Sequence, residues 1–133
     1  MVITATQPLL DVTLPVELTN GNTGRGHKWF NSAKIRQAME RDLIEYRRRE
    51  PFSQQTSVVV TRILGKGQRL WDSSSVLRGN WKEIEDALVS LGWWWDDGPQ
   101  WIHSTLGQQD EFQRQNGPAV RVEVYIPEQR EAR

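Results

Sequence analysis

Two neighbouring aspartates that follow a run of tryptophans are the residues of this chain best suited to metal chemistry. The stretch GWWWDDGP (residues 92–99) carries them at Asp96 and Asp97, and a third candidate, Asp72, lies earlier in the chain. Mg²⁺ prefers carboxylate oxygens and water, and paired metal ions can stabilise the attacking and leaving oxygens when a phosphodiester is cleaved. This chemistry requires carboxylates from separate elements to converge. The alternative is structural, with an aspartate that caps a helix and an Asp-Asp-Gly-Pro turn, and local sequence alone favours it because such turns are common.

A lysine near these carboxylates has two interpretations. Lys82 lies four residues before Asp86 within an expected helix, which is the spacing of an intrahelical ion pair. The same lysine could instead lie beside a carboxylate site and stabilise the charge of a phosphate. Other catalytic groups are not expected, because His27 and His103 have no partner at metal-ligand spacing and the serines at 73–75 have no identifiable base.

The charges of the chain are balanced in number but unevenly distributed. The chain has 17 lysines and arginines, 17 aspartates and glutamates, and no cysteine. The absence of cysteine excludes disulfides and thiolate metal sites. Residues 24–36 and 62–69 are basic and contain no acid, whereas acids concentrate at 83–97 and 123–131. This distribution predicts a basic surface around a carboxylate site.

Hydrophobic periodicity in the first half of the chain predicts two strands and a helix. Residues 11–19 alternate apolar and polar side chains, which predicts a strand, and Pro15 places it at the edge of a sheet. Residues 30–50 have apolar residues at helical spacing and predict a helix that ends before Pro51. The β-branched run at 55–64 predicts a second strand.

A second helix is predicted from about Ser75 to Leu91. Its apolar residues recur every three or four positions and form one face, and Gly92 fits its C-terminal cap. A helix of that length spans about 25 Å, so Asp72 and Asp97 can meet only if the chain beside the helix folds back along it. The apolar face consists of Leu77, Trp81, Ile84, Leu88 and Leu91.

Two further strands, at 99–107 and 119–126, complete the predicted fold. The order strand, helix, strand, helix, strand, strand indicates an α+β fold in which two main helices cover one face of a mixed β-sheet. We expect a single domain over residues 1–133, with loose tails at about 1–10 and 127–133. No segment is apolar and long enough to cross a membrane, so we expect a soluble cytoplasmic protein.

The tryptophans at 93–95 cannot all lie on one side of an extended chain, because neighbouring side chains point in opposite directions. We expect at least one in the core and one exposed or at an interface, with stacking on nucleic-acid bases as the alternative. An apolar wall beside Asp97 would favour the neutral carboxyl group, which predicts a raised pKa for Asp97 in the absence of metal. The chain has seven tryptophans, more than one small core needs, so we also expect a homodimer contact near them.

The segment around Lys82 resembles the RusA-like Holliday-junction resolvases of bacteria and their phages. That family has the pattern Asp-x-Asp-Asn, a lysine three residues after the asparagine, then Asp-Ala-Leu, a glycine, an aromatic stretch and Asp-Asp. The residues that match in spacing are Lys82, Asp86-Ala87-Leu88, Gly92, Trp93-Trp94 and Asp96-Asp97. The similarity extends over roughly residues 12–126, through an opening strand, a basic segment and a closing valine-rich strand.

The chain departs from the family pattern at the first two aspartates. Val76 and Arg78 stand at those positions, and Gly79 stands at the position of the asparagine. Asp72 takes the role of the first ligand only if the chain has an insertion of about one helical turn, and the second ligand then falls on Ser74. A serine hydroxyl carries less negative charge than a carboxylate, which leaves open weaker metal binding or loss of catalysis.

The resemblance implies a homodimeric, Mg²⁺-dependent endonuclease that cleaves four-way junctions or other branched DNA, with Mn²⁺ as an alternative metal. It implies that Asp72 and Asp97 bind the metal with support from Asp96 and Ser74, and that Lys82 stabilises the transferring phosphate. The cations expected to neutralise the DNA backbone, and so to make binding salt-dependent, are Arg25, Lys28, Lys34, Lys66, Arg69 and Arg78. Two alternatives remain: a DNA-binding or assembly protein of the same fold that has lost catalysis, and an interaction module that binds a protein through its tryptophans.

Overall fold

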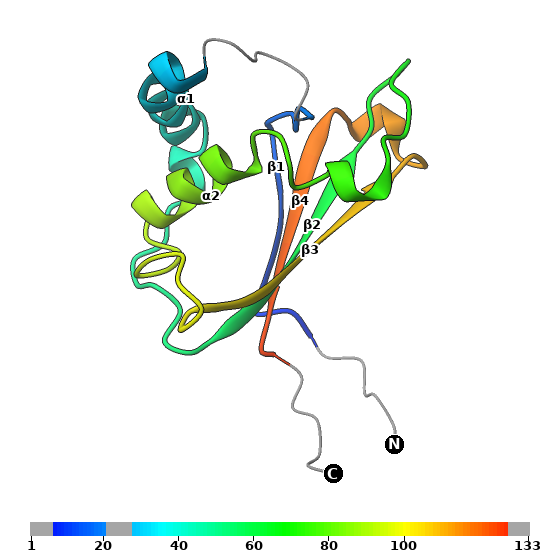
Figure 1. Ribbon diagram of the computed structural model, residues 1–133. Coiled ribbons are helices and arrows are strands. Elements are labelled where there is room, and N and C mark those ends of the chain that lie inside the picture. Colours follow the sequence, from blue (N-terminus) through cyan, green and yellow to red (C-terminus); the bar gives the residue numbers. More distant parts are fainter. Residues whose placement is uncertain (1–6, 21–27, 128–133) are drawn as a thin grey trace.

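A four-stranded mixed sheet forms the centre of the protein (Figure 1). The computed structural model describes residues 7–20 and 28–127, and for residues 28–32 it describes the backbone alone. The strands lie in the order β1-β4-β2-β3, with β4 antiparallel to both of its neighbours and β3 parallel to β2. They are β1 (Leu10–Leu14), β2 (Thr56–Ile63), β3 (Ile102–Asp110) and β4 (Ala119–Tyr125). The predicted mixed sheet of an α+β fold is confirmed.

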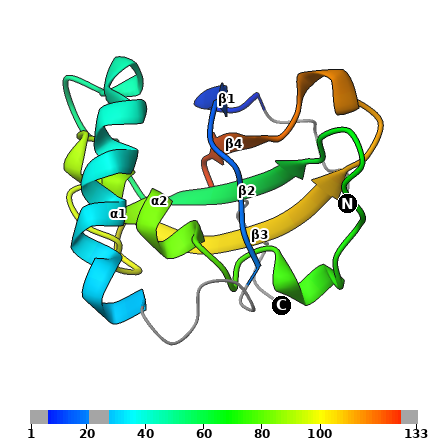
Figure 2. The same ribbon diagram turned by 90° about the horizontal axis from the view of Figure 1, so that it is seen from above.

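Two helices cover one face of this sheet, with α1 further from the strands than α2 (Figure 2). They are α1 (Lys28–Asp42) and α2 (Trp81–Ser90), and short 3-10 helices are η1 (Ile44–Tyr46), η2 (Ser73–Ser75) and η3 (Arg114–Asn116). Ile84 and Leu88 of α2 are fully buried in one core with Val60 and Val122 of the sheet. α1 packs against α2. Within the described parts of the chain, no helix combines the length and apolar character needed to cross a membrane.

The helix predicted for residues 30–50 ends earlier than expected, at the end of α1. The backbone N–H of Arg48 donates to the carbonyl oxygen of Leu91 at 2.9 Å, and that of Phe52 donates to Trp93 at 2.9 Å. A helix that continued to residue 50 would need the N–H of Arg48 for its own hydrogen bond. Pairing with the chain after α2 therefore overrides the local helix propensity.

α2 also begins later than predicted, at Trp81. Gly79 lies so close to Thr19 that an added Cβ would come 1.5 Å from the carbonyl oxygen of Thr19. The side chain of Asn80 accepts from the N–H of Thr19 at 2.9 Å and donates to the carbonyl oxygen of Glu17 at 2.9 Å. This packing against the chain after β1 sets the start of α2. The helix has 10 residues and spans about 15 Å instead of the expected 25 Å.

β3 is displaced from its predicted position at 99–107. It pairs in parallel with β2, from Ser57 opposite Ser104 to Ile63 opposite Asp110, so the strand continues through residues predicted as loop. β3 is an edge strand, and most of its side chains are at least partly exposed. Its polar sequence therefore lacks the apolar alternation that reveals a half-buried strand. β1 is the other edge strand, as predicted, although it ends before Pro15.

Gly92 reverses the chain at the end of α2, as its predicted capping role requires. Its φ angle is +89°, in the left-handed region that favours glycine. The N–H of Gly92 donates to Val89 at 3.0 Å, and the N–H of Trp93 donates to Leu88 at 3.0 Å. This pair of hydrogen bonds is the Schellman motif that closes the C-terminus of a helix.

The tryptophans after Gly92 divide as predicted between core and surface. Trp93 and Trp94 are 0% and 1% exposed, whereas Trp95 is 65% exposed. The indole N–H of Trp93 donates to the carbonyl oxygen of Tyr46 at 2.8 Å, and that of Trp94 donates to the hydroxyl of Thr56 at 3.0 Å. The two buried indoles thus satisfy their polar atoms while they connect the end of α2 to η1 and β2.

We expect Gly92→Ala to destabilise the protein more than Gly67→Ala. Both glycines have left-handed φ angles, +89° and +81°, where a side chain costs about 1–2 kcal/mol. At Gly92 the new Cβ would also meet the carbonyl oxygen of Arg48 at 2.6 Å, whereas nothing lies within 4 Å at Gly67. The free energy of unfolding in urea should fall by about 1 kcal/mol in Gly67→Ala and by at least about 3 kcal/mol in Gly92→Ala. Equal losses would contradict a steric role for the close approach at Gly92.

Candidate metal centre

Three carboxylates and one lysine converge where the chain folds back along α2. Glu85 and Asp86 lie three and four residues after Lys82, so the three side chains share one side of the helix. Asp97 reaches them from the turn that follows Gly92. One oxygen atom from each of the three carboxylates lies within 4.8 Å of the other two. We refer to Glu85, Asp86 and Asp97 as the carboxylate group.

Lys82 is the cation of this arrangement. Its Nζ lies 3.2 Å from Oδ1 of Asp86 and 3.5 Å from Oε1 of Glu85, and it donates a hydrogen bond to Oδ2 of Asp97. The ion pair predicted with Asp86 is confirmed, and the same ammonium also lies beside a group of carboxylates. The side chains of Lys82 and Asp97 are 57% and 42% exposed, so the group opens to solvent.

The pKa values of Asp97 and Glu85 are shifted in opposite directions, one by Lys82 and the other by burial. The hydrogen bond from Lys82 lowers the pKa of Asp97 below its ordinary value of 3.8, and the same bond raises the pKa of Lys82. Burial raises the pKa of Glu85, whose side chain is 13% exposed. The predicted rise in the pKa of Asp97 is wrong, because this carboxylate is partly exposed and paired, whereas Trp93 and Trp94 are buried in the core.

Asp96 and Asp97 have different roles. Oδ1 of Asp96 accepts a hydrogen bond from the N–H of Gly98 at 2.7 Å, so this side chain closes the turn. Asp96 is not a member of the carboxylate group. The supporting metal role predicted for Asp96 therefore does not fit the geometry, and Asp97 is the aspartate of the pair that faces Lys82.

Asp72 lies at the other end of β3 from Asp97. The residue before Asp72 exchanges two hydrogen bonds of 3.0 Å with Gln109, near the end of the strand. The residue after Asp97 accepts a 2.9 Å hydrogen bond from the N–H of Ile102, at the start of the strand. At 3.3 Å per residue these two points are about 23 Å apart. The structure thus contradicts a metal shared by Asp72 and Asp97, and Ser74 in η2 lies with Asp72.

Glu85 and Asp86 take the positions beside Asp97 that the sequence analysis gave to Asp72 and Ser74. The sequence predicted an ion pair with Lys82 for Asp86, which also matches the Asp-Ala-Leu of the resembling family, and it predicted no role for Glu85. The signal was nevertheless present, because Lys82, Glu85 and Asp86 have the spacing of one helix face, and a capping glycine turns the chain that carries Asp96 and Asp97 back along the helix.

Two arginines hold the basic loop between β2 and η2. Arg62 lies over the ring of Trp71 at 3.6 Å and donates to the carbonyl oxygen of Arg69 at 2.9 Å. Arg114 donates to two further carbonyl oxygens of the loop at 2.8 and 2.7 Å. Lys66 and Arg69 are exposed on this loop, at the end of the sheet that lies away from the carboxylate group.

The other cations predicted to contact DNA lie on different segments. Lys34 is exposed on α1, and Arg78 is exposed between η2 and α2. Arg25 and the side chain of Lys28 lie outside the described residues. The described members of the predicted basic surface thus come from three separate segments.

Comparisons with known proteins give no assignment. No protein family model matches the chain, and no curated protein was found to match it. The resemblance to the RusA-like resolvases therefore stays a prediction.

The carboxylate group could hold a metal ion. Mg²⁺ takes oxygen ligands in octahedral geometry at 2.0–2.1 Å, so opposite ligands are about 4.2 Å apart. The three carboxylate oxygens lie within 4.8 Å of one another, and two of the side chains are partly exposed and able to adjust toward a metal ion. One ammonium also leaves an excess of negative charge among three carboxylates, which a divalent cation would balance.

We expect Lys82→Gln to raise the pKa of Asp97 above that in the unmodified protein, because the substitution removes the hydrogen bond that lowers it. Titration of the Asp97 side-chain carbon by ¹³C NMR measures this pKa, and Lys66→Gln is the matched control. A lowered folded pKa stabilises the protein above about pH 4, and this stability is lost as pH falls through the folded value. Lys82→Gln should therefore remove that acid-dependent loss. If the pKa of Asp97 is the same in Lys82→Gln and in the unmodified protein, Lys82 is not the cause of the lowered pKa.

Proposed function

We propose that this protein is a metal-dependent, structure-selective endonuclease that cleaves four-way junctions or other branched DNA. The observation that carries the proposal is the convergence of Glu85, Asp86 and Asp97 beside Lys82. Carboxylate oxygens favour Mg²⁺, with Mn²⁺ as an alternative, and phosphodiester cleavage benefits from a metal and a cation at the transferring phosphate. Branched DNA as the substrate follows from the sequence resemblance.

Each member of the site has a role in this proposal. Asp97 and Asp86 are partly exposed and would bind the metal on the side open to substrate, and the less exposed Glu85 would complete the ligand set. A bound metal supplies charge stabilisation to the attacked phosphate. Lys82 exchanges its contact with Asp97 for a contact with the phosphate, whose developing charge it stabilises.

A DNA-binding or assembly protein without catalysis is the second candidate. Lys82 already contacts all three carboxylates, so a metal must compete with a lysine for them. In addition, Val76 and Arg78 stand where the resembling family has carboxylates. In this alternative the ion pairs of Lys82 serve to hold the turn that contains Asp97 against α2.

We further propose that the protein acts as a homodimer in the cytoplasm. A two-fold assembly suits a four-way junction, which presents equivalent strands in pairs. Large apolar side chains support a contact surface, since Trp95, Leu106 and Phe112 are 65%, 59% and 88% exposed. Aromatic residues are enriched at protein interfaces.

Asp97→Asn should abolish Mg²⁺-dependent cleavage of a labelled four-way junction and leave junction binding nearly unchanged. The substitution keeps the shape of the side chain but removes the charge that a metal needs. Asp86→Asn should reduce cleavage about tenfold or more. Asp72→Asn should have little effect, because Asp72 lies at the other end of β3. Cleavage is measured with and without Mg²⁺, and binding is measured by gel shift in the absence of metal.

Asp96→Asn is the matched control, since Asp96 closes the turn without joining the carboxylate group. Its cleavage rate should remain close to that of the unmodified protein. Normal cleavage by Asp97→Asn would refute the proposed site. Junction binding without cleavage in either Mg²⁺ or Mn²⁺ would instead favour the second candidate.

DNA binding should weaken as salt rises, despite the zero net charge of the chain. Replacing both Lys66 and Arg69 with glutamine should weaken binding to all sequences alike, because backbone contacts carry no sequence information. The slope of log affinity against log salt should become less steep by about 1.8, at about 0.9 for each lost phosphate contact. An unchanged slope would exclude the loop from the interface, and a complete absence of salt-sensitive binding would favour a protein-interaction module.

A further inference from the structure

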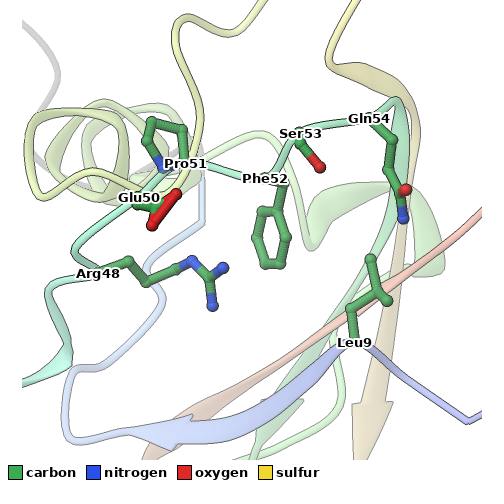
Figure 3. Close-up of a pocket in the computed structure, with 7 residues that line it drawn as sticks. All are labelled: Leu9, Arg48, Glu50, Pro51, Phe52, Ser53 and Gln54. Carbon is green, nitrogen blue, oxygen red and sulfur yellow. The ribbon is translucent and has the colours of Figure 1, made fainter.

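A pocket of about 410 Å³ lies between the segment that follows η1 and the residue that precedes β1 (Figure 3). Its volume is within the range of about 300–1,000 Å³ that is typical of small-molecule sites. None of the residues that line it belongs to the carboxylate group. The lining combines one arginine with apolar and polar side chains, among them Arg48, Leu9, Pro51, Phe52, Ser53 and Gln54.

The core holds the wall that carries Arg48 and Phe52. The backbone N–H groups of both residues are bonded to the chain after α2, each at 2.9 Å. The ring of Phe52 is 5% exposed and packs against Trp94 with 6.0 Å between ring centres. Because these contacts already hold this side of the pocket in place, a ligand would not have to order it. The entropic cost of binding is therefore lower.

Arg48 brings a positive charge to this pocket. Its guanidinium carbon lies 4.0 Å over the centre of the Phe52 ring, and Figure 3 shows the guanidinium directed into the space between Phe52 and Leu9. Within residues 7–20 and 28–127, no ion pair involves Arg48, and its buried Nε has no hydrogen-bond partner. A guanidinium beside an aromatic ring can still donate from the N–H groups at its planar edge to acceptors in the same plane.

We propose that this pocket binds a small monocarboxylate with a short apolar chain. A carboxylate matches the planar donor edge of Arg48, because two parallel N–H···O bonds can form between them. Leu9, Pro51 and Phe52 provide apolar contacts for the chain. Glu50 also lines the pocket and disfavours the dianionic form of inorganic phosphate, because one arginine does not offset two negative charges beside a carboxylate.

NMR titration of the ¹⁵N-labelled protein with hexanoate at pH 7 tests this proposal. Hexanoate should shift the Arg48 Nε–H signal and the backbone N–H signal of Leu9. Arg48→Lys keeps the charge but removes the planar donor edge, so hexanoate should bind it at least about tenfold more weakly. Arg49→Lys, at an exposed neighbouring position, is the matched control and should bind as the unmodified protein does.

A second variant and three further probes make the result decisive. Leu9 is 39% exposed, so Leu9→Asp should preserve the fold while it places a second negative charge in the pocket, and it should bind hexanoate about tenfold more weakly. Hexanol, which lacks the carboxylate, and inorganic phosphate, which lacks the chain, should both bind more weakly than hexanoate. The proposal is overturned if hexanol or phosphate binds as well as hexanoate, or if both variants bind it normally. Tighter binding of acetyl-Ala-Leu would also overturn it, since a peptide carboxylate would then be the better ligand.

Discussion

The left-handed backbone at Gly92 is the constraint on which the rest of the structure depends. It ends α2 and turns the chain back on itself, which buries Trp93 in the core and returns Asp97 to Lys82. It also lets the carbonyl of Arg48 approach where a side chain would stand. The core, the carboxylate group and the pocket therefore all depend on the same turn of the backbone at Gly92. A larger residue at this point would disturb all three together, because their positions follow from the same reversal.

The carboxylate group shows how a cluster of like charges is held together in a folded protein. Three carboxylates at this spacing repel one another, and the ammonium of Lys82 offsets part of that repulsion. The opposite pKa shifts of Asp97 and Glu85 express the same balance, since one carboxylate gains a hydrogen bond and the other loses solvent. A lysine is a suitable internal counter-ion because its flexible chain lets it leave without disturbing the backbone.

Local patterns in the sequence were sufficient for the fold class, the cap at Gly92 and the division of the tryptophans. They failed where contacts between distant segments decided the outcome. The start of α2 depends on the close approach of Gly79 to Thr19, and the end of α1 depends on hydrogen bonds to the chain after α2. Neither contact leaves a periodic signal. The resemblance selected Asp97 through its spacing from Lys82, and the structure places these two side chains in contact, whereas Asp72 was misplaced because its position relative to β3 depends on Gln109.

The parallel pairing of β2 with β3 has a consequence for how the molecule folds. α2 and the turn with Asp97 lie inside the crossover that connects these two strands. Two parallel strands can pair only after the long connection between them has folded back. Loop-closure entropy makes that step slow compared with the formation of a hairpin. Lys82 and Asp97 therefore reach their places beside the sheet only when this crossover closes. An isolated peptide of this region would lack the sheet that holds the two ends of the crossover together, and it would not retain the arrangement of charges seen in the folded chain.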